Sequence, residues 1–328
     1  MNSIIITSIF HPTKAVKAFS DLPDFQLVVI GDKKSPQDWH QDKVQYLSIE
    51  EQEALKYEVI SLLPYNHYCR KIIGYLYAIQ KGAAIIIDTD DDNIPKSKWG
   101  FPLFEDHFNI TNQDVGFINV YKYFTDKHIW PRGFPLNKIQ DQNSIIEESS
   151  LISEKVKVGI WQGLADSDPD VDAIYRLTSN EECYFDTKEP VVLAKGSICP
   201  FNSQNTAFVK ELFPLLYLPS FVTFRFTDIL RGLIAQPIMW LYDYHLGFSN
   251  ATVIQERNPH DFLKDFESEI PCYLFPERIV DLVSANIDKR NSLEGNLFNS
   301  YKALVANKLV PDKELDLLKL WLKDLASI

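Results

Sequence analysis

The first third of the chain alternates short apolar runs with segments of helical periodicity. The apolar runs are rich in β-branched residues and are bounded by polar or turn-forming residues, which predicts buried strands. Apolar positions recur at helical spacing between these runs, and Ser48 with Glu51 forms a capping-box pattern. This alternation predicts an α/β fold with a parallel sheet and crossover helices. The predicted strands are 3–7, 25–32 and 83–88, and the predicted helices are 14–20, 48–63 and 66–82.

The rest of the chain changes from strand-like to helical patterns. Residues 115–124 and 156–163 alternate as strands do, whereas 227–241 has the spacing of a helix. From about residue 260 onward the pattern is helical and ends in an amphipathic segment. No internal repeat or linker is evident, so we expect a catalytic domain over 1–260 with a helical region over 261–328 packed on it.

Composition and net charge indicate which classes of function are disfavoured. The 328 residues are 45% hydrophobic and 24% charged, which is typical of a packed globular protein. The net charge of -12 and the absence of a Lys/Arg-rich run disfavour bulk nucleic-acid binding.

The N-terminal pattern and the spacing of the cysteines indicate in which cellular compartment we expect the protein. The four cysteines are far apart and form no CxxC pair, which disfavours a zinc site or a disulfide scaffold. The N-terminus lacks the pattern of a signal peptide, and no apolar run approaches the length of a spanning helix. We therefore expect a cytoplasmic protein without a transmembrane segment.

The strongest local feature is an acidic cluster, DTDDDNIP, at residues 88–95. It follows an apolar strand, and the carboxyl ends of parallel strands are where α/β proteins bind ligands. Carboxylate oxygens suit Mn²⁺ or Mg²⁺, which completes its coordination with substrate phosphates. Asp90 and Asp92 are the expected metal ligands, with Asp88 and Asp91 in reserve. The alternative interpretation is a solvated acidic turn.

Several separated motifs resemble a known family. The segment YCRKIIGYLYAIQKGAAIIIDTDDDNIP at 68–95 resembles the STELLO-type glycosyltransferases, and WPRGFPLNKI, PFNSQNTAF and RFTDILRGLIAQ fit the same pattern in order. A looser similarity, carried by GIWQG, DVDAIYRLT and YDYHLGF, connects the chain to the plant reversibly glycosylated proteins, which include UDP-arabinopyranose mutases. Together the matching stretches cover most of residues 65–260.

The resemblance implies a GT-A-like, Rossmann-type nucleotide-sugar-binding fold with a mostly helical C-terminal extension. It also implies a metal-dependent glycosyltransferase that takes a nucleotide-sugar donor, a UDP-sugar by our expectation, and an unidentified hydroxyl acceptor. Two alternatives remain open at this point. One is a mutase that interconverts pyranose and furanose nucleotide-sugars, and the other is a non-catalytic scaffold partner that keeps the fold.

The family pattern assigns candidate nucleotide-sugar ligands to polar residues near the strand ends. Basic residues beside the crossover helix and arginines near the family's acidic position are expected to contact the nucleotide or its phosphates. Each has a structural alternative, such as a surface pair or an ion pair. The candidates are Thr7, Asp32, Arg70, Lys71, Asp88, Arg225 and Arg231.

The remaining candidates concern catalysis and the acceptor. Asp228 lies where the family pattern has an acidic residue, and we expect a general base there if transfer inverts the anomeric centre. His245 is a further metal candidate, from a part of the chain where GT-A enzymes draw a third ligand. Aromatic and carboxylate side chains after a predicted strand suit sugar hydroxyls. These acceptor or sugar candidates are Trp161, Gln162, Asp168 and Asp170.

Overall fold

The computed structural model describes residues 1–257 and 260–328. A ten-stranded mixed sheet runs through the molecule in the order β3-β2-β1-β4-β11-β8-β6-β9-β12-β5, with β8 also paired to β12. The strands are β1 Asn2–Thr7, β2 Phe25–Ile30, β3 Val44–Leu47, β4 Ile85–Thr89, β5 Asn93–Pro95, β6 Glu105–Ile110, β7 Gly116–Phe117, β8 Ile152–Asp166, β9 Val191–Leu193, β10 Ser197–Ile198, β11 Asn205–Val209 and β12 Tyr244–Gln255.

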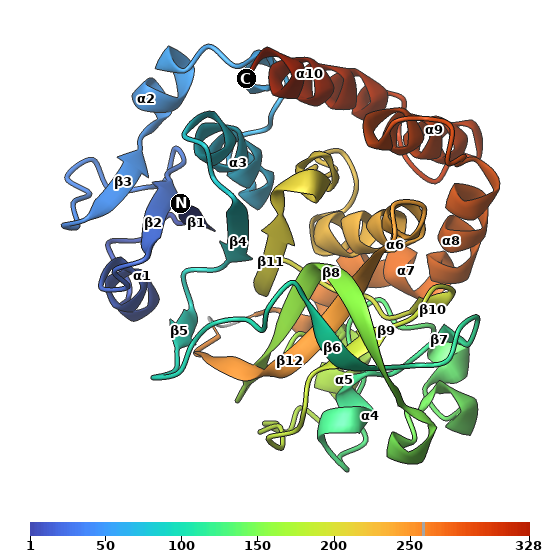
Figure 1. The fold of residues 1–328 in the computed structure, drawn as a ribbon. Coiled ribbons are helices and arrows are strands. Elements are labelled where there is room, and N and C mark those ends of the chain that lie inside the picture. The colour runs from blue at the N-terminus through green and yellow to red at the C-terminus, as the bar shows by residue number, and fades with distance from the viewer. Residues whose placement is uncertain (258–259) are drawn as a thin grey trace.

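Helices cover the sheet and close one side of the molecule. Figure 1 shows α8, α9 and α10 as an arc that returns the C-terminus toward the N-terminal third of the chain. The helices are α1 Lys14–Ser20, α2 Ile49–Ala54, α3 Lys71–Gln80, α4 Tyr121–Phe124, α5 Ala173–Thr178, α6 Thr227–Trp240, α7 Phe262–Leu274, α8 Pro276–Ala285, α9 Leu293–Ala306 and α10 Lys313–Ser327.

The predicted parallel α/β start is confirmed. Strands β3, β2, β1 and β4 pair in parallel, and β11 continues the sheet antiparallel to β4. Successive residues of β1 enter two different apolar clusters: Ile5 packs toward α3, whereas Ile4 and Ile6 pack toward α1. Burial on both faces explains why this strand reads as a continuous apolar run. The GT-A-like α/β fold with a mixed central sheet is therefore confirmed.

Two predicted elements are wrong in extent. The capping box of Ser48 and Glu51 is present, but α2 ends at Ala54 because Lys56 adopts a left-handed backbone with φ of 59°. The predicted strand 115–124 has only the two residues of β7 paired in a sheet and then turns into α4.

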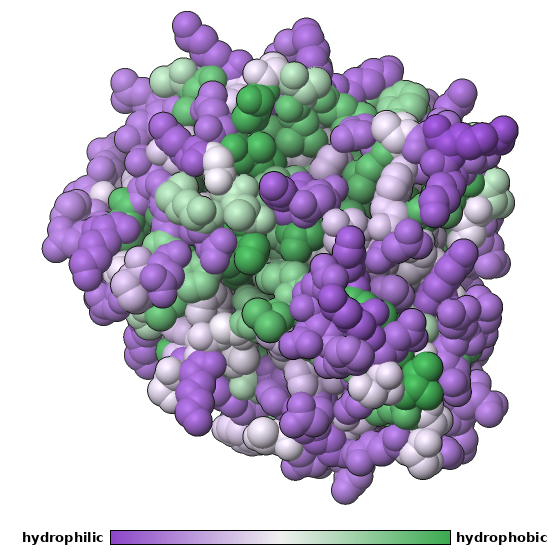
Figure 2. All heavy atoms as spheres, in the orientation of Figure 1, coloured by the Kyte–Doolittle hydropathy of each residue, from purple (hydrophilic) through white to green (hydrophobic). Residues whose placement is uncertain are grey.

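The C-terminal helices pack on the preceding part of the chain. Asp324 of α10 accepts hydrogen bonds from the backbone N–H groups of Glu58 and Val59. Glu314, at the start of α10, accepts from the N–H groups of Ser220 and Phe221. Figure 2 shows that polar side chains cover most of the viewed face, with apolar side chains gathered toward its top, where α3 and α10 lie. The helical C-terminal extension is thus confirmed, while the division into two domains at residue 260 stays a prediction.

Candidate functional site

A pocket of about 320 Å³ opens at the carboxyl ends of β1, β2 and β4. This is the edge at which open α/β sheets bind ligands. The lining residues are Thr7, Ser8, Ile9, Phe10, Ile30, Gly31, Asp32, Lys34, Asn66, His67, Tyr68, Arg70, Asp90, Asp91, Asp92, Arg132, Asp170, Asn202, Ser203, Gln204, Phe224, Arg225, Asp228, Gln255, Arg257 and His260.

The acidic segment after β4 divides into one structural carboxylate and three that face the pocket. Asp88 is fully buried and lies 2.8 Å from both Lys71 Nζ and Arg231 NH1. Burial raises the pKa of Asp88, but the two cations outweigh burial and hold this pKa below its usual value. Asp88, Lys71 and Arg231 do not line the pocket, so the expectation that they contact the nucleotide is corrected. They anchor the segment that carries Asp90.

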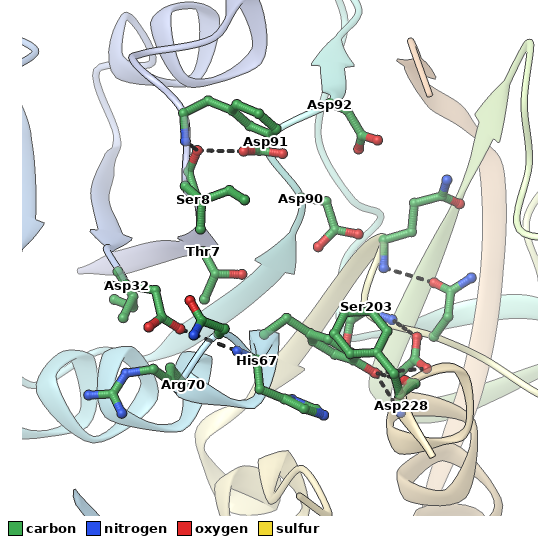
Figure 3. Close-up of a pocket in the computed structure, with 18 of the residues that line it drawn as sticks. Thr7, Ser8, Asp32, His67, Arg70, Asp90, Asp91, Asp92, Ser203 and Asp228 are labelled. Atoms are coloured by element: carbon green, nitrogen blue, oxygen red, sulfur yellow. Dashed lines mark hydrogen bonds between the residues drawn. The ribbon is translucent and has the colours of Figure 1, made fainter. Parts of the chain in front are cut away.

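Asp90, Asp91 and Asp92 line the pocket, and nearby cations and hydrogen-bond donors compensate their negative charges only in part. Burial raises the pKa of Asp90 to about 6, although Lys71 Nζ lies 2.6 Å from its Oδ1. Burial also raises the pKa of Asp92 to about 7, with repulsion from Asp90 and Asp91 as the next cause. Figure 3 shows Asp91 turned toward Ser8, which donates a hydrogen bond to it, whereas Asp90 points into the open centre.

One buried carboxylate oxygen of this segment has no hydrogen-bond partner among the residues that the structure describes. Asp92 Oδ1 accepts no hydrogen bond, while Asp92 Oδ2 accepts a 3.3 Å bond from Gln255 Nε2. Among residues 1–257 and 260–328, no three His, Cys, Asp or Glu side chains are grouped so as to hold a metal ion. Mg²⁺ in phosphate-binding sites commonly uses only one or two protein carboxylates and takes its other ligands from phosphate and water. An unpartnered buried carboxylate oxygen beside Asp90 fits that donor set.

The wall formed by β1, β2 and the segment before α3 carries the predicted nucleotide contacts. Thr7 ends β1, and Asp32 follows β2 with its Oδ2 accepting a 3.2 Å bond from His67 N. Arg70 donates from Nε to Gln52 Oε1 at 2.9 Å, which fixes its guanidinium. The structure therefore brings Thr7, Asp32 and Arg70 together on one wall (Figure 3).

His67 on this wall is kept neutral by its surroundings. Burial lowers the pKa of His67 to about 4, against an opposing effect of Asp32. Its Nδ1 lies 3.1 Å from Cys69 N and accepts that hydrogen bond, so the neutral ring carries its proton on Nε2.

On the opposite wall, one arginine joins two carboxylates. Arg132 donates to Asp228 from NH1 at 3.1 Å and from NH2 at 3.0 Å, and to Asp170 from Nε at 2.9 Å and from NH2 at 2.7 Å. Asp228 also accepts from Tyr68 Oη at 3.2 Å and from Ser203 N at 3.2 Å. Asp170 and Asp228 thus lie in the pocket as expected, but both begin as fully hydrogen-bonded carboxylates.

Arg225 extends this charged wall. Its Nε donates to Glu269 at 2.8 Å, and its NH2 lies 3.7 Å from Asp170. Arg225 lines the pocket beside Phe224. Arg225 thus lies in the pocket, as a contact with a phosphate requires. Its guanidinium, however, is already paired with the buried carboxylate of Glu269.

Four further expected site residues lie elsewhere. The Trp161 ring is fully buried and packs edge-on against Phe108 with centroids 5.2 Å apart, so it cannot stack on a sugar. Gln162 is buried and accepts from Asn202 N at 3.1 Å, which fixes the backbone beside the pocket. Asp168 pairs with Arg176 outside the pocket lining. These three acceptor-site expectations are corrected.

His245 is also remote from the acidic segment. It lies at the start of β12 beside the carbonyl oxygen of Lys157, whereas Gln255 at the other end of this 12-residue strand reaches Asp92. A strand rises about 3.3 Å per residue, so His245 is too far away to share a metal with Asp92.

The sequence interpretation missed several lining residues. Ser203 and Gln204 belong to the quoted PFNSQNTAF segment, and Arg132 belongs to WPRGFPLNKI, so the family motifs could have indicated them. Arg257 follows β12 with no motif around it, and only the pairing of β12 with β5 brings it beside the acidic segment.

Comparisons with known proteins agree with the resemblance. A family described as STELLO glycosyltransferases matches residues 225–328. The chain is 31% identical over 258 residues to "Probable glycosyltransferase STELLO2" of Arabidopsis thaliana, covering 72% of this chain and 33% of that protein. It is 27% identical over 348 aligned positions to "Probable glycosyltransferase STELLO1" of the same plant, covering 99% of this chain and 44% of that protein.

These matches confirm the similarity to the STELLO-type proteins; they do not show the looser similarity to the reversibly glycosylated proteins. The chain spans less than half the length of the two curated relatives. In the part of the chain that the structure describes, no helix is long and apolar enough to cross a membrane.

Proposed function

We propose that this STELLO-type chain is a metal-dependent glycosyltransferase that moves a glycosyl group from a nucleotide-sugar, a UDP-sugar by our expectation, to a hydroxyl acceptor. The observation that carries the proposal is the set of under-compensated carboxylates, Asp90, Asp91 and Asp92, at the carboxyl ends of the parallel strands. The names of the relatives, both described as glycosyltransferases, support the same class of reaction.

Asp90 and Asp92 are the residues that would hold Mn²⁺ or Mg²⁺. A divalent cation there would be coordinated by the unpartnered Asp92 Oδ1. It would also relieve the repulsion between neighbouring carboxylates. Such a cation supplies compensation for the negative charge that develops on a leaving diphosphate.

The two walls of the pocket then have different tasks. Thr7 and Asp32 would bind the nucleoside, because they offer hydroxyl and carboxylate groups on the side of β1 and β2, whereas the fully buried Arg70 guanidinium, held by Gln52, would position this wall. The acceptor would enter on the side of Asp170 and Asp228, across the acidic segment. This arrangement would place the bond between sugar and phosphate between the two walls.

Asp228 remains the proposed proton acceptor for the attacking hydroxyl. Its oxygens are occupied by Arg132 and Tyr68, so an acceptor hydroxyl must displace one of these donors before Asp228 can act as a base. Arg132 keeps its bonds to Asp170 when it releases Asp228, which lowers the electrostatic cost of that exchange.

The test is a thermal-shift and calorimetric titration of UDP with and without Mn²⁺. The wild-type protein should bind UDP in a Mn²⁺-dependent way and melt at a higher temperature when both are present. The Asp90→Asn/Asp92→Asn double variant should lose the Mn²⁺-dependent part. Asp24→Asn, at an exposed position, should behave as wild type. Equal UDP binding with and without Mn²⁺, or none at all in folded protein, would refute the proposal.

A further inference from the structure

Arg257 is a largely buried cation that, among the residues the structure describes, makes no hydrogen bond to a carboxylate. It follows β12, lines the pocket, and has a side chain only 10% exposed. Within residues 1–257 and 260–328, its nearest carboxylate oxygens lie 3.8 Å away on Asp168 and 3.9 Å away on Asp265. These separations exceed hydrogen-bond length, and the buried Nε–H has no acceptor.

The neighbouring carboxylates have closer partners than Arg257, which for Asp265 is His260 at 2.9 Å and for the others is another arginine. Arg176 pairs with Asp168, Arg132 with Asp170, and Arg225 with Glu269. Arg257 is therefore the arginine of this wall whose nearest carboxylates, Asp168 and Asp265, have closer partners. Burial lowers the pKa of Arg257 to about 10, and the positive charges of Arg225 and Arg176 add to that effect. A buried charge with only distant partners is less well compensated than a hydrogen-bonded one, so a ligand that brings an opposite charge into hydrogen-bond range would stabilise it.

The position of Arg257 indicates which ligand would supply it. The preceding residue, Glu256, donates its N–H to the carbonyl oxygen of Asp92 at 3.0 Å, and Gln255 Nε2 donates to the Asp92 side chain at 3.3 Å. Arg257 and the acidic segment therefore border the same part of the pocket. A cation held by Asp90 and Asp92 would face this guanidinium across a space that suits a strongly anionic group.

We infer that Arg257 binds the diphosphate of the nucleotide-sugar from the side opposite the metal-binding carboxylates. This inference rests on the proposed function. A guanidinium can donate two parallel N–H bonds to two phosphate oxygens, which an ammonium group cannot do with the same geometry. When the bond between sugar carbon and phosphate oxygen breaks, its electron pair stays on that oxygen, and Arg257 stabilises the added charge.

The inference is tested by calorimetry with UDP, UMP and uridine in the presence of Mg²⁺. For Arg257→Gln, the dissociation constant of UDP should rise ~10- to 100-fold, whereas those of UMP and uridine should change by less than about threefold. Arg257→Lys should fall between wild type and Arg257→Gln. Lys264→Gln removes one positive charge from an exposed site and should match wild type.

A second measurement separates ligand binding from a structural role. Because Arg257 makes only long ion pairs and, among the described residues, no hydrogen bond to a carboxylate, Arg257→Gln without ligand should melt at the same temperature as wild type or higher. A large decrease in that melting temperature, or an equal loss of affinity for UDP, UMP and uridine, would overturn the inference.

Two further outcomes distinguish this inference from the proposed function. If wild type binds UDP with Mg²⁺ and Arg257→Gln binds it equally well, the inference fails and the function stands. If wild type binds none of the three, the function fails first. If Arg257→Gln keeps UDP affinity but loses a preference for UDP-glucuronate over UDP-glucose, the guanidinium binds a sugar carboxylate, and the assignment to the diphosphate is wrong.

Discussion

Individual side chains in this pocket differ by what compensates their charge. Asp88 has two buried cations and is structural, whereas Asp92 has an unpartnered oxygen in the same short segment. Asp228 has several donors and can act only after one of them leaves. The chemistry of each carboxylate therefore follows from its partners rather than from its place in an acidic motif.

Asp228→Asn tests the proposed proton acceptor. Because an amide cannot take a proton from the acceptor hydroxyl, glycosyl transfer should slow by about 10²- to 10⁴-fold. The dissociation constant of UDP with Mn²⁺ should change less than about threefold, since Asp228 lies on the acceptor wall. Steady-state kinetics and calorimetry on the same preparation measure both. A variant that keeps wild-type turnover would remove Asp228 from the catalytic role.

His67→Gln tests the effect of the partly buried imidazole on stability. The pKa of His67 is lowered to about 4 in the folded protein, so the folded state resists a proton that the unfolded chain takes up near pH 6.5. Its contribution is present above that pH and is lost as the pH falls from about 6.5 to about 4. At pH 5 the loss amounts to about 2 kcal/mol.

Denaturant titrations at pH 7.5 and pH 5 measure this contribution. On acidification from pH 7.5 to pH 5, the free energy of unfolding should fall by about 2 kcal/mol more in wild type than in His67→Gln. Identical pH dependence of the two proteins would show that His67 titrates normally.

At the scale of elements, α3 is positioned by a close approach to the sheet. A Cβ atom on Gly74 would lie 2.7 Å from the side chains of both Ile5 and Ile30. This approach holds α3 against β1 and β2, whose carboxyl ends carry Thr7 and Asp32. Packing of this helix thereby sets the position of the nucleotide wall.

Gly74→Ala should destabilise the protein by about 1–2 kcal/mol despite the better helix propensity of alanine, because the added methyl group overpacks the interface. Gly295→Ala in α9 is the matched control. Its nearest neighbour would lie 3.4 Å away, so the substitution should be neutral or stabilising by about 0.5 kcal/mol. Chemical denaturation of both variants decides the sign. A stabilising Gly74→Ala would show that the interface can relax.

Elements with a strong local pattern could be predicted from the sequence, and those set by distant contacts could not. β1, β4, α1 and α6 follow their apolar periodicity closely. The end of α2 could not be read locally, because Asp324 of α10 binds the N–H groups that follow it. In 115–124, Asn119 donates to the carbonyl oxygen of Ile129, which favours a turn over a strand.

The candidate site shows the same division. The acidic segment and Asp228 could be found from motifs, whereas the burial of Trp161 and the placement of Arg257 depend on strand pairing across the sheet.

At the scale of the whole molecule, the pocket joins segments that are spread from Thr7 to His260. Its walls come from the N-terminal strands, the loop with Arg132, the segment before β11 and the end of β12. The C-terminal helices contribute indirectly, since Glu314 binds the backbone at Ser220 and Phe221, a few residues before Phe224. The proposed function therefore depends on a nucleotide wall and an acceptor wall that meet at the acidic segment.

Formation of UDP from UDP-sugars with water as the acceptor hydroxyl tests that claim most directly. Wild-type protein with Mn²⁺ should release UDP slowly from at least one of a panel of UDP-sugars. EDTA and the Asp90→Asn/Asp92→Asn substitutions should abolish this release, while Asp24→Asn should leave it unchanged. If folded wild-type protein released no UDP from any of these donors, or if the double variant released UDP equally well, the acidic segment would not be a metal-dependent site of glycosyl transfer.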